Sequence, residues 1–137
     1  MNDRYLFRGK RVGNGEWVEG YYVCLNVDRH FIYTGYAETD CGTYYPDCHE
    51  VIPETVGQCT GLKDKNGKWI FEGDVVKAYD ETYDNGFAEV KGKIFFNCGS
   101  FDIDDDVGYI PLYAYGTENV EVIGNIHDNP ELLEVER

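Results

Sequence analysis

Cysteine and histidine offer the first candidates for chemistry in this chain. Cys41, Cys48 and His49 lie in one short segment with acidic residues beside them. Zinc sites usually take four ligands, and paired ligands are usually separated by two to four residues. The gap between Cys41 and Cys48 is longer, and adjacent residues such as Cys48 and His49 would point to opposite faces of a strand. We therefore expect ordinary loop residues here, and a metal-dependent module is the third of our functional hypotheses.

A second candidate is the acidic stretch of residues 102–108, which begins like a calcium-binding loop. Such a loop requires glycine at its sixth position and an acid at its twelfth. Val107 and Tyr113 occupy these two positions in this chain. The pattern therefore predicts a solvated acidic turn and no bound metal.

Nucleophilic catalysis would need a thiol or hydroxyl with a base beside it. Cys59 could use His30, His49 or His127 as a base, but no recognisable signature surrounds it. Ser100 is the only serine and lacks a nucleophile elbow. The glycines do not form a phosphate-binding loop before a helix. We expect a protein that is not an enzyme and that needs no cofactor.

Charge and composition limit the partners. Acidic residues outnumber basic ones by 26 to 12, so the formal net charge of the 137 residues is −14. Binding to nucleic acid requires Lys and Arg to neutralise phosphates, and here the basic residues are scattered singly among acids. Direct contact with nucleic acid or an anionic membrane is therefore disfavoured. A solvated surface is the ordinary explanation of the charge, and a basic partner or mimicry of DNA charge is the alternative.

Compartment is predicted from the start of the chain and from its cysteines. The first residues of the sequence contain no apolar run, so we expect no signal peptide. No stretch approaches the ~20 apolar residues that a membrane helix requires. Five cysteines without paired spacing are typical of free thiols in a reducing environment. We expect a cytoplasmic protein.

Turn-forming dipeptides are the most frequent structural signal in the segments that must position the candidate residues. The dipeptide Asn-Gly favours a type I′ hairpin turn because both residues tolerate positive φ. It occurs between segments rich in β-branched and aromatic residues at three sites: Asn14-Gly15, Asn66-Gly67 and Asn85-Gly86. These segments predict short strands at residues 5–7, 17–25, 30–34, 74–79, 88–96, 109–115 and 120–126. The fold class is therefore all-β, as a barrel or a sandwich.

The rest of the chain is predicted to be loops and one helical turn. Residues 37–44, 79–87 and 97–108 lack a strand pattern. Near the end, Asn129 precedes Pro130 and Glu131, which is a typical cap and first turn of a helix. We expect a short helical turn over residues 128–133, whose leucines cover an open end of the sheet.

Two segments resemble the YopX family, which is found in phage and prophage genomes. Residues 56–76 (VGQCTGLKDKNGKWIFEGDVV) are similar to its hallmark segment, and residues 120–133 (VEVIGNIHDNPELL) to its closing motif. Residues 7–10 and 17–20 also fit its opening. The sequence departs from the motif at Cys59, where an aromatic residue is commoner, and residues 80–118 are outside the resemblance.

The resemblance implies an all-β fold with a small SH3-like barrel in the C-terminal part, residues 54–137, preceded by an N-terminal β-hairpin subdomain, residues 1–53. It implies no activity, because the biochemical role of the family is not established. Candidate binding residues are the polar ones of the two motifs: Asp64, Asn66, Glu72, Asp74 and Asn129. Within the motif, Gly73 would permit a sharp reversal. The acids of this set either cap turn amides or contact a partner, and capping is the simpler expectation.

The functional prediction follows from these points. We expect a phage- or prophage-derived accessory or assembly protein that acts in the cytoplasm of a bacterial host through protein–protein contacts, including contacts with a second copy. The alternative is an acidic mimic of DNA that inhibits a DNA-binding protein.

Overall fold

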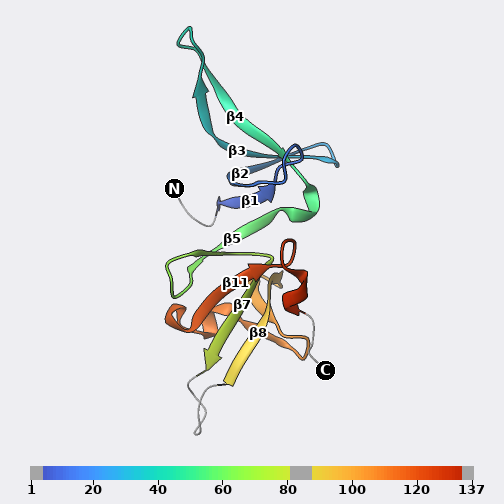
Figure 1. Cartoon of the computed structure of the whole chain (residues 1–137), viewed down its shortest axis with the longest axis vertical. Helices are drawn as coiled ribbons and strands as arrows, with labels where there is room; N and C mark the ends of the chain where they lie inside the picture. The colour runs from blue at the N-terminus through green and yellow to red at the C-terminus, as the bar shows by residue number, and fades with distance from the viewer. Residues whose placement is uncertain (1–4, 81–87, 134–137) are drawn as a thin grey trace. The chain divides into compact units, whose positions relative to one another are not determined.

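The computed structural model describes residues 5–80 and 88–133, which divide into two units, Met1–Cys59 and Thr60–Arg137 (Figure 1). The described elements are β-strands joined by turns and by short 3₁₀ helices. All strand pairs with a described register are antiparallel. The prediction of an all-β protein is confirmed. Among these residues, no helix is both long and apolar enough to cross a membrane.

Unit 1 is built on four strands that follow one another in space as they do along the chain. The elements are β1 Phe7–Lys10, β2 Trp17–Leu25, β3 Arg29–Glu38, β4 Tyr44–Val51 and the 3₁₀ helix η2 Pro53–Thr55. The order β4-β3-β2-β1 continues to β5, Gly57–Lys63, whose first residues pair with β1. The chain passes into unit 2 along β5, between Cys59 and Thr60.

The interior of unit 1 is small. Ile32, Val51 and Cys59 are its fully buried apolar side chains. Gly20 of β2 lies directly against β3, and a Cβ there would meet the carbonyl oxygen of Tyr33 at 2.0 Å. Arg8 is also buried, and its guanidinium carbon lies 4.7 Å from the centre of the Trp17 ring. The cation and the ring attract one another at this distance.

Unit 2 contains the remaining elements. The strands are β6 Trp69–Phe71, β7 Asp74–Asp80, β8 Ala88–Asn97, β9 Ser100–Asp104, β10 Tyr109–Pro111 and β11 Val120–Asn125, and the 3₁₀ helices are η3 Leu112–Ala114, η4 Thr117–Asn119 and η5 Pro130–Leu133. Five strands form one sheet in the order β10-β9-β8-β7-β11, and β6 continues the order that ends in β5. Over the described residues the five-stranded sheet does not close into a barrel, because β10 and β11 are its two edges.

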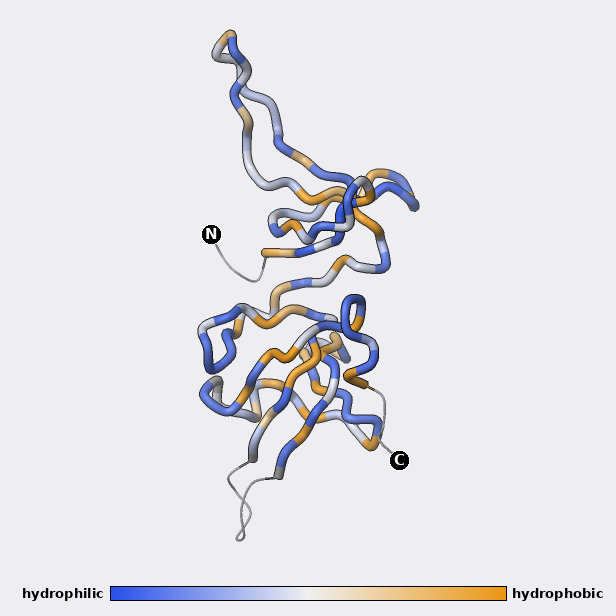
Figure 2. Tube along the Cα trace, viewed as in Figure 1, coloured by the Kyte–Doolittle hydropathy of each residue, from blue (hydrophilic) through white to orange (hydrophobic). Residues whose placement is uncertain are grey.

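The main hydrophobic core lies in unit 2. Its fully buried members come from five different strands and from η3: Ile70, Val76, Ala78, Ile94, Ile103, Leu112 and Val120. Figure 2 shows the corresponding hydrophobic stretches of β7, β8 and β11 inside this unit. Burial of these side chains is the main force that holds the sheet folded.

Four strands, β4, β5, β6 and β9, are outside the predicted strand ranges, and β10 is shorter than predicted. Strand β4 occupies a segment for which no strand was predicted, and β3 extends to Glu38. The loop predicted at residues 37–44 therefore covers only residues 39–43. Half of the residues of β4 are exposed and the strand includes Pro46 and Asp47, so it lacks the alternation that indicates a strand. Strand β9 lies inside the predicted loop of residues 97–108. Predicted strand 109–115 ends at Pro111, after which η3 begins.

The two Asn-Gly sites within the described residues lie in hairpin turns, but not of the predicted type. Gly15 and Gly67 have φ of 71° and 80°, whereas Asn14 and Asn66 are not among the residues with positive φ. A type I′ turn needs positive φ at both positions, so that part of the prediction is wrong. At the second site the Gly67 amide donates to the Asp64 carbonyl at 3.0 Å, which makes a four-residue turn ending in a left-handed glycine. Asn85-Gly86 is outside the described residues.

Candidate functional site

Asp64 is a buried predicted site residue whose carboxylate accepts three backbone hydrogen bonds. It stands at the start of the turn between β5 and β6 and is only 5% exposed. Its Oδ1 accepts the backbone amides of Asn66 and Lys68, both at 2.9 Å. Its Oδ2 accepts the backbone amide of Val122 in β11 at 3.0 Å. One carboxylate therefore shapes its own turn and fixes that turn to a strand 58 residues further along the chain.

Two opposing effects act on the pKa of Asp64. Burial raises the pKa of this carboxyl, but the hydrogen bonds from the amides of Val122, Lys68 and Asn66 together outweigh burial. The pKa therefore lies below its ordinary value of 3.8. A carboxylate that accepts several amide hydrogens is stabilised in its charged form. Asp64 thus stays ionised inside the fold, where its oxygens serve the backbone.

Asp74 opens β7 and is 1% exposed. Its Oδ2 accepts the backbone amide of Phe71 at 2.8 Å, across the reversal that Gly73 makes with φ of 91°. The Gly73 amide donates to the Ile94 carbonyl at 2.8 Å, and the Gly73 carbonyl accepts the Ile126 amide at 2.9 Å. The sharp reversal predicted at Gly73 is confirmed. Asp74 joins two strands, as a turn-capping residue does.

The other three predicted site residues differ in burial. Asn66 is exposed at the tip of its turn, and Glu72 is half-buried beside Gly73. Asn129 is half-buried, and its Oδ1 accepts the Asn125 amide at 3.3 Å while its carbonyl accepts the Leu132 amide at 3.1 Å. The capping role considered for Asp64 and Asp74 therefore has direct geometry behind it. A binding role for this residue set stays a prediction.

The two motif segments meet in unit 2. Strand β11 pairs with β7, so that Asn125 faces Asp74 and Val122 faces Val76. The Lys65 amide also donates to the Val120 carbonyl at 2.8 Å. The residues predicted as a site thus lie along one structural joint, where the turn between β5 and β6 and the start of β7 are fastened to β11. The hydrogen bonds described at this joint hold backbone segments together. Among its described residues, no set of reactive side chains converges.

The thiol and imidazole candidates differ in exposure. Cys41 and Cys48 are exposed, and Cys59 is fully buried as a small apolar side chain. His49 has its Nε2 3.5 Å from Oδ1 of Asp47. Over residues 5–80 and 88–133, no three cysteine, histidine or acidic side chains gather closely enough to hold a metal ion.

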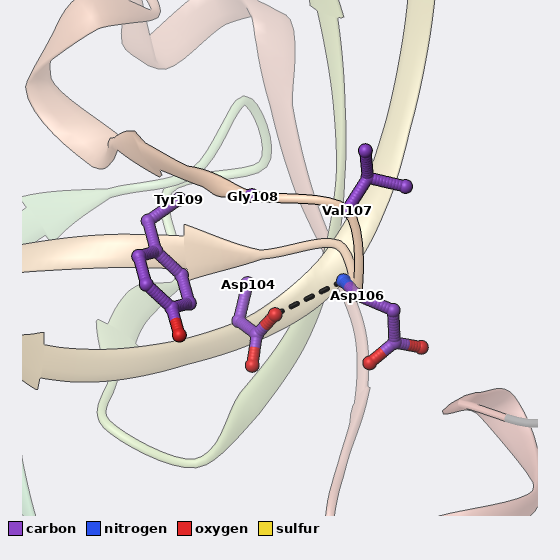
Figure 3. A pocket seen from close by; sticks show the side chains of 5 residues that line it. All are labelled: Asp104, Asp106, Val107, Gly108 and Tyr109. Carbon is purple, nitrogen blue, oxygen red and sulfur yellow. Dashed lines mark hydrogen bonds between the residues drawn. The ribbon is translucent and has the colours of Figure 1, made fainter.

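The acidic stretch near residue 104 forms a turn whose carboxylates cap its own amides. Oδ1 of Asp104 accepts the Asp106 amide at 3.0 Å (Figure 3). Oδ1 of Asp105 accepts the Gly108 amide at 2.8 Å. An open hollow of about 320 Å³ lies beside the turn and is also lined by Tyr109. Asp102, in contrast, is buried and accepts hydrogen bonds from Asn97 and Ser100. These bonds account for the acids as turn and strand-end caps.

One cluster of polar side chains in unit 1 was missed. The Tyr22 hydroxyl bonds to Nδ1 of His30, and Nε2 of His30 lies 3.2 Å from the Val27 carbonyl. Since a carbonyl only accepts, Nε2 carries the proton and Nδ1 accepts from Tyr22. Sγ of Cys24 is 3.9 Å from Nε2 and donates to the Asn26 carbonyl at 2.9 Å. Burial, and then the neighbouring Cys24, raise the pKa of Tyr22.

The missed cluster links β2 to β3 across the turn between them. Both ring nitrogens of His30 take part in hydrogen bonds, Nδ1 with Tyr22 and Nε2 with the Val27 carbonyl. His30 therefore does not act as the base for Cys24 in this arrangement. Tyr22 and Cys24 are two apart on one strand face, but only the register of the folded sheet places His30 opposite Cys24. The sequence alone suggested His30 only as a base for Cys59.

Comparison with known proteins identifies a family and a similar solved structure. A comparison with curated protein sequences found no match. The crystal structure of protein EF1440 from Enterococcus faecalis is similar, with a TM-score of 0.56 and 28% sequence identity over 93% of this chain and 96% of that chain. The model of the YopX protein family matches residues 6–134, which include the segment 80–118 that the motifs left out. The chain therefore belongs to the YopX family.

Proposed function

We propose that this chain is a non-enzymatic accessory or assembly protein of a phage or prophage that acts in the bacterial cytoplasm through protein–protein contacts. The observation that carries the proposal is the exposure of large side chains on an acidic molecule. Tyr36, Tyr44 and Tyr113 are each at least two-thirds exposed, and Val107 is 94% exposed. Exposed apolar groups that gather on a surface often mark interaction sites. Family membership is compatible with this role and specifies no reaction.

We also propose that unit 2 serves as an SH3-like scaffold. The first four strands of its five-stranded sheet, β7 to β10, follow one another in space. The last strand, β11, returns after short 3₁₀ helices to pair with β7. This order supports an SH3-like barrel that remains open between β10 and β11. Such a scaffold would hold turns and loops rigidly for contact with a partner.

The net charge of −14 favours a second candidate, an acidic mimic of DNA that inhibits a DNA-binding protein. Such a mimic would bind its target in a strongly salt-dependent manner, because the interaction replaces phosphate contacts. Binding that persists at 0.5 M salt would count against mimicry and leave the accessory role as the better proposal.

The experiment for the proposed function combines affinity capture with a measurement of oligomeric state. The tagged protein is incubated with lysate of a bacterial host, and bound proteins are compared with those on an unrelated bait of similar size and net charge. The unrelated bait removes proteins that bind any acidic surface. Light scattering during size-exclusion chromatography reports self-association. A strictly monomeric protein that retains nothing beyond the control bait would refute the proposal.

A further inference from the structure

The outer part of the hairpin between β3 and β4, residues 34–47, extends away from β1 and β2; we call it the arm (Figure 1). The register pairs Tyr36 with Pro46 and Glu38 with Tyr44. Paired residues share a face, and alternate residues of a strand do so too. Tyr36, Glu38, Tyr44 and Pro46 therefore lie on one face of the arm. All four are exposed, and the two tyrosines are 76% and 67% accessible.

The arm carries negative charge that its own residues do not neutralise. Residues 34–47 contain Glu38, Asp40 and Asp47, but neither Lys nor Arg. Asp47 accepts a hydrogen bond from Thr34 at 2.9 Å and lies 3.5 Å from His49. Within the part of the chain that the structure describes, Glu38 and Asp40 form no ion pair. Two exposed rings are thus combined with uncompensated carboxylates.

The base of the same hairpin indicates what such a combination binds. There Phe31 is paired across the strands with Glu50. The guanidinium carbon of Arg29 lies 5.2 Å from the centre of the Phe31 ring, and its Nη2 lies 3.4 Å from Oε1 of Glu50. One aromatic residue and one glutamate on facing strands thus hold an arginine. Further out, Tyr44 and Glu38 form the same kind of pair, and within residues 5–80 and 88–133 no arginine stacks on or bonds to it.

A second copy of this chain fits the arm poorly. Each copy carries a net charge of −14, so two arms would meet as like charges. Strand β4 is an edge of its sheet, but Pro46 has no amide hydrogen and thereby interrupts the donors that a further strand would need. A cationic partner avoids both obstacles, because guanidinium groups stack on tyrosine rings and bond to carboxylates.

We propose that the Tyr36–Tyr44 face of the arm is a docking site for an arginine-bearing segment of a basic protein. The inference rests on the proposed function, because it names the surface and the partner chemistry of those protein–protein contacts. In the complex, an arginine would stack on Tyr44 and bond to Glu38, as Arg29 does with Phe31 and Glu50.

The first test measures binding of the full chain to a fluorescein-labelled peptide of alternating arginine and glycine, by fluorescence anisotropy. The double variant Y36S/Y44S should weaken binding on the order of ten-fold, and E38Q about three-fold. The matched controls Y5S/Y21S and E54Q change exposed residues outside the arm and should stay within about two-fold of wild type. A peptide with citrulline in place of arginine should not bind. Equal weakening by the control variants, or unaltered binding by Y36S/Y44S, would overturn the docking site.

A second measurement keeps the test sound if a variant folds poorly. In amide NMR spectra of the wild-type chain, addition of the arginine peptide should shift the signals of residues 35–46 most. Shifts spread evenly over all acidic surfaces would overturn the assignment. Capture from lysate separates the two proposals: a partner retained equally by wild type and Y36S/Y44S refutes the arm alone, whereas no partner for wild type refutes the proposed function.

Discussion

Replacing Asp64 with asparagine removes one buried carboxylate while keeping the size of the side chain. At most one of the two positions, Oδ1 or Oδ2, can then remain an acceptor. If the new amino group faces Val122, the backbone donor there loses its acceptor at a cost of about 1–3 kcal/mol. The two hydrogen bonds at the other oxygen then have an uncharged acceptor, which weakens them by about 1 kcal/mol in total. We therefore expect D64N to lower the free energy of unfolding of unit 2 by about 2–4 kcal/mol.

The assay is urea unfolding at pH 7, followed by Trp69 fluorescence in a background where Trp17 is replaced by phenylalanine. Trp69 lies in β6, so its signal reports unit 2. Asp106→Asn is the matched control, because Asp106 is exposed and its φ of 72° suits asparagine. The control should change stability by less than about 0.5 kcal/mol. If D64N were as stable as the control, Asp64 would not be fastening the turn to β11.

The same pair of proteins tests the pKa of Asp64. Because the pKa is lower in the folded chain than its ordinary value of 3.8, the ionised carboxylate stabilises the fold fully above that value. The stabilisation is lost as the pH falls through the lower pKa of the folded chain. The difference in unfolding free energy between wild type and D64N should therefore be constant from pH 5 to 7 and should shrink below about pH 3.8. A difference that stayed unchanged at pH 2.5 would contradict the assignment.

Three further predictions concern the close packing of the sheets and the thiols. Gly92→Ala should destabilise unit 2 by about 3 kcal/mol in the same urea assay, because its Cβ would lie 2.2 Å from the Asp104 carbonyl oxygen; Gly108→Ala, with open space around it, is the control and should have little effect. Gly73→Ala should cost about 1–2 kcal/mol, because φ of 91° strains a residue with a Cβ; an unchanged midpoint would argue against that conformation. A thiol reagent should modify four cysteines rapidly and Cys59 only on unfolding, as mass spectrometry of the labelled chain would show; rapid labelling of Cys59 would disprove its burial.

Local sequence signals predicted the strands whose residues alternate or are uniformly apolar. Strand β2 was predicted with its observed bounds, and β7 and β11 within one residue at their ends. Strand β4 was not, because it is formed by pairing with β3 and only one of its eight residues is buried. The turn type at Asn66 also escaped prediction, because the Asp64 carboxylate caps the Asn66 and Lys68 amides in a turn that does not need positive φ at Asn66.

The candidate site shows the same limit. The sequence identified Asp64 and Asp74 as polar residues in a distinctive motif and left open whether they cap turns or bind a partner. The choice depends on groups distant in the chain, such as the Val122 amide, and on burial. The cluster around His30 depends in the same way on the register that places Cys24 opposite it. Residue type and spacing do not contain such information unless the pairing of the strands is already known.

Structure and family membership together direct functional work away from the motifs. The two segments that resemble the family supply the bonds from Asp64 to Val122 and from Gly73 to Ile126, which hold unit 2 together. Substitutions there would alter folding, and any effect on a partner would be indirect. Tyr36 and Tyr44 lie outside those segments and are exposed, so their replacement should change binding and leave stability within about 0.5 kcal/mol of wild type. A variant pair that separates the two properties in this way would be direct evidence that the motif specifies the scaffold and the arm the contact.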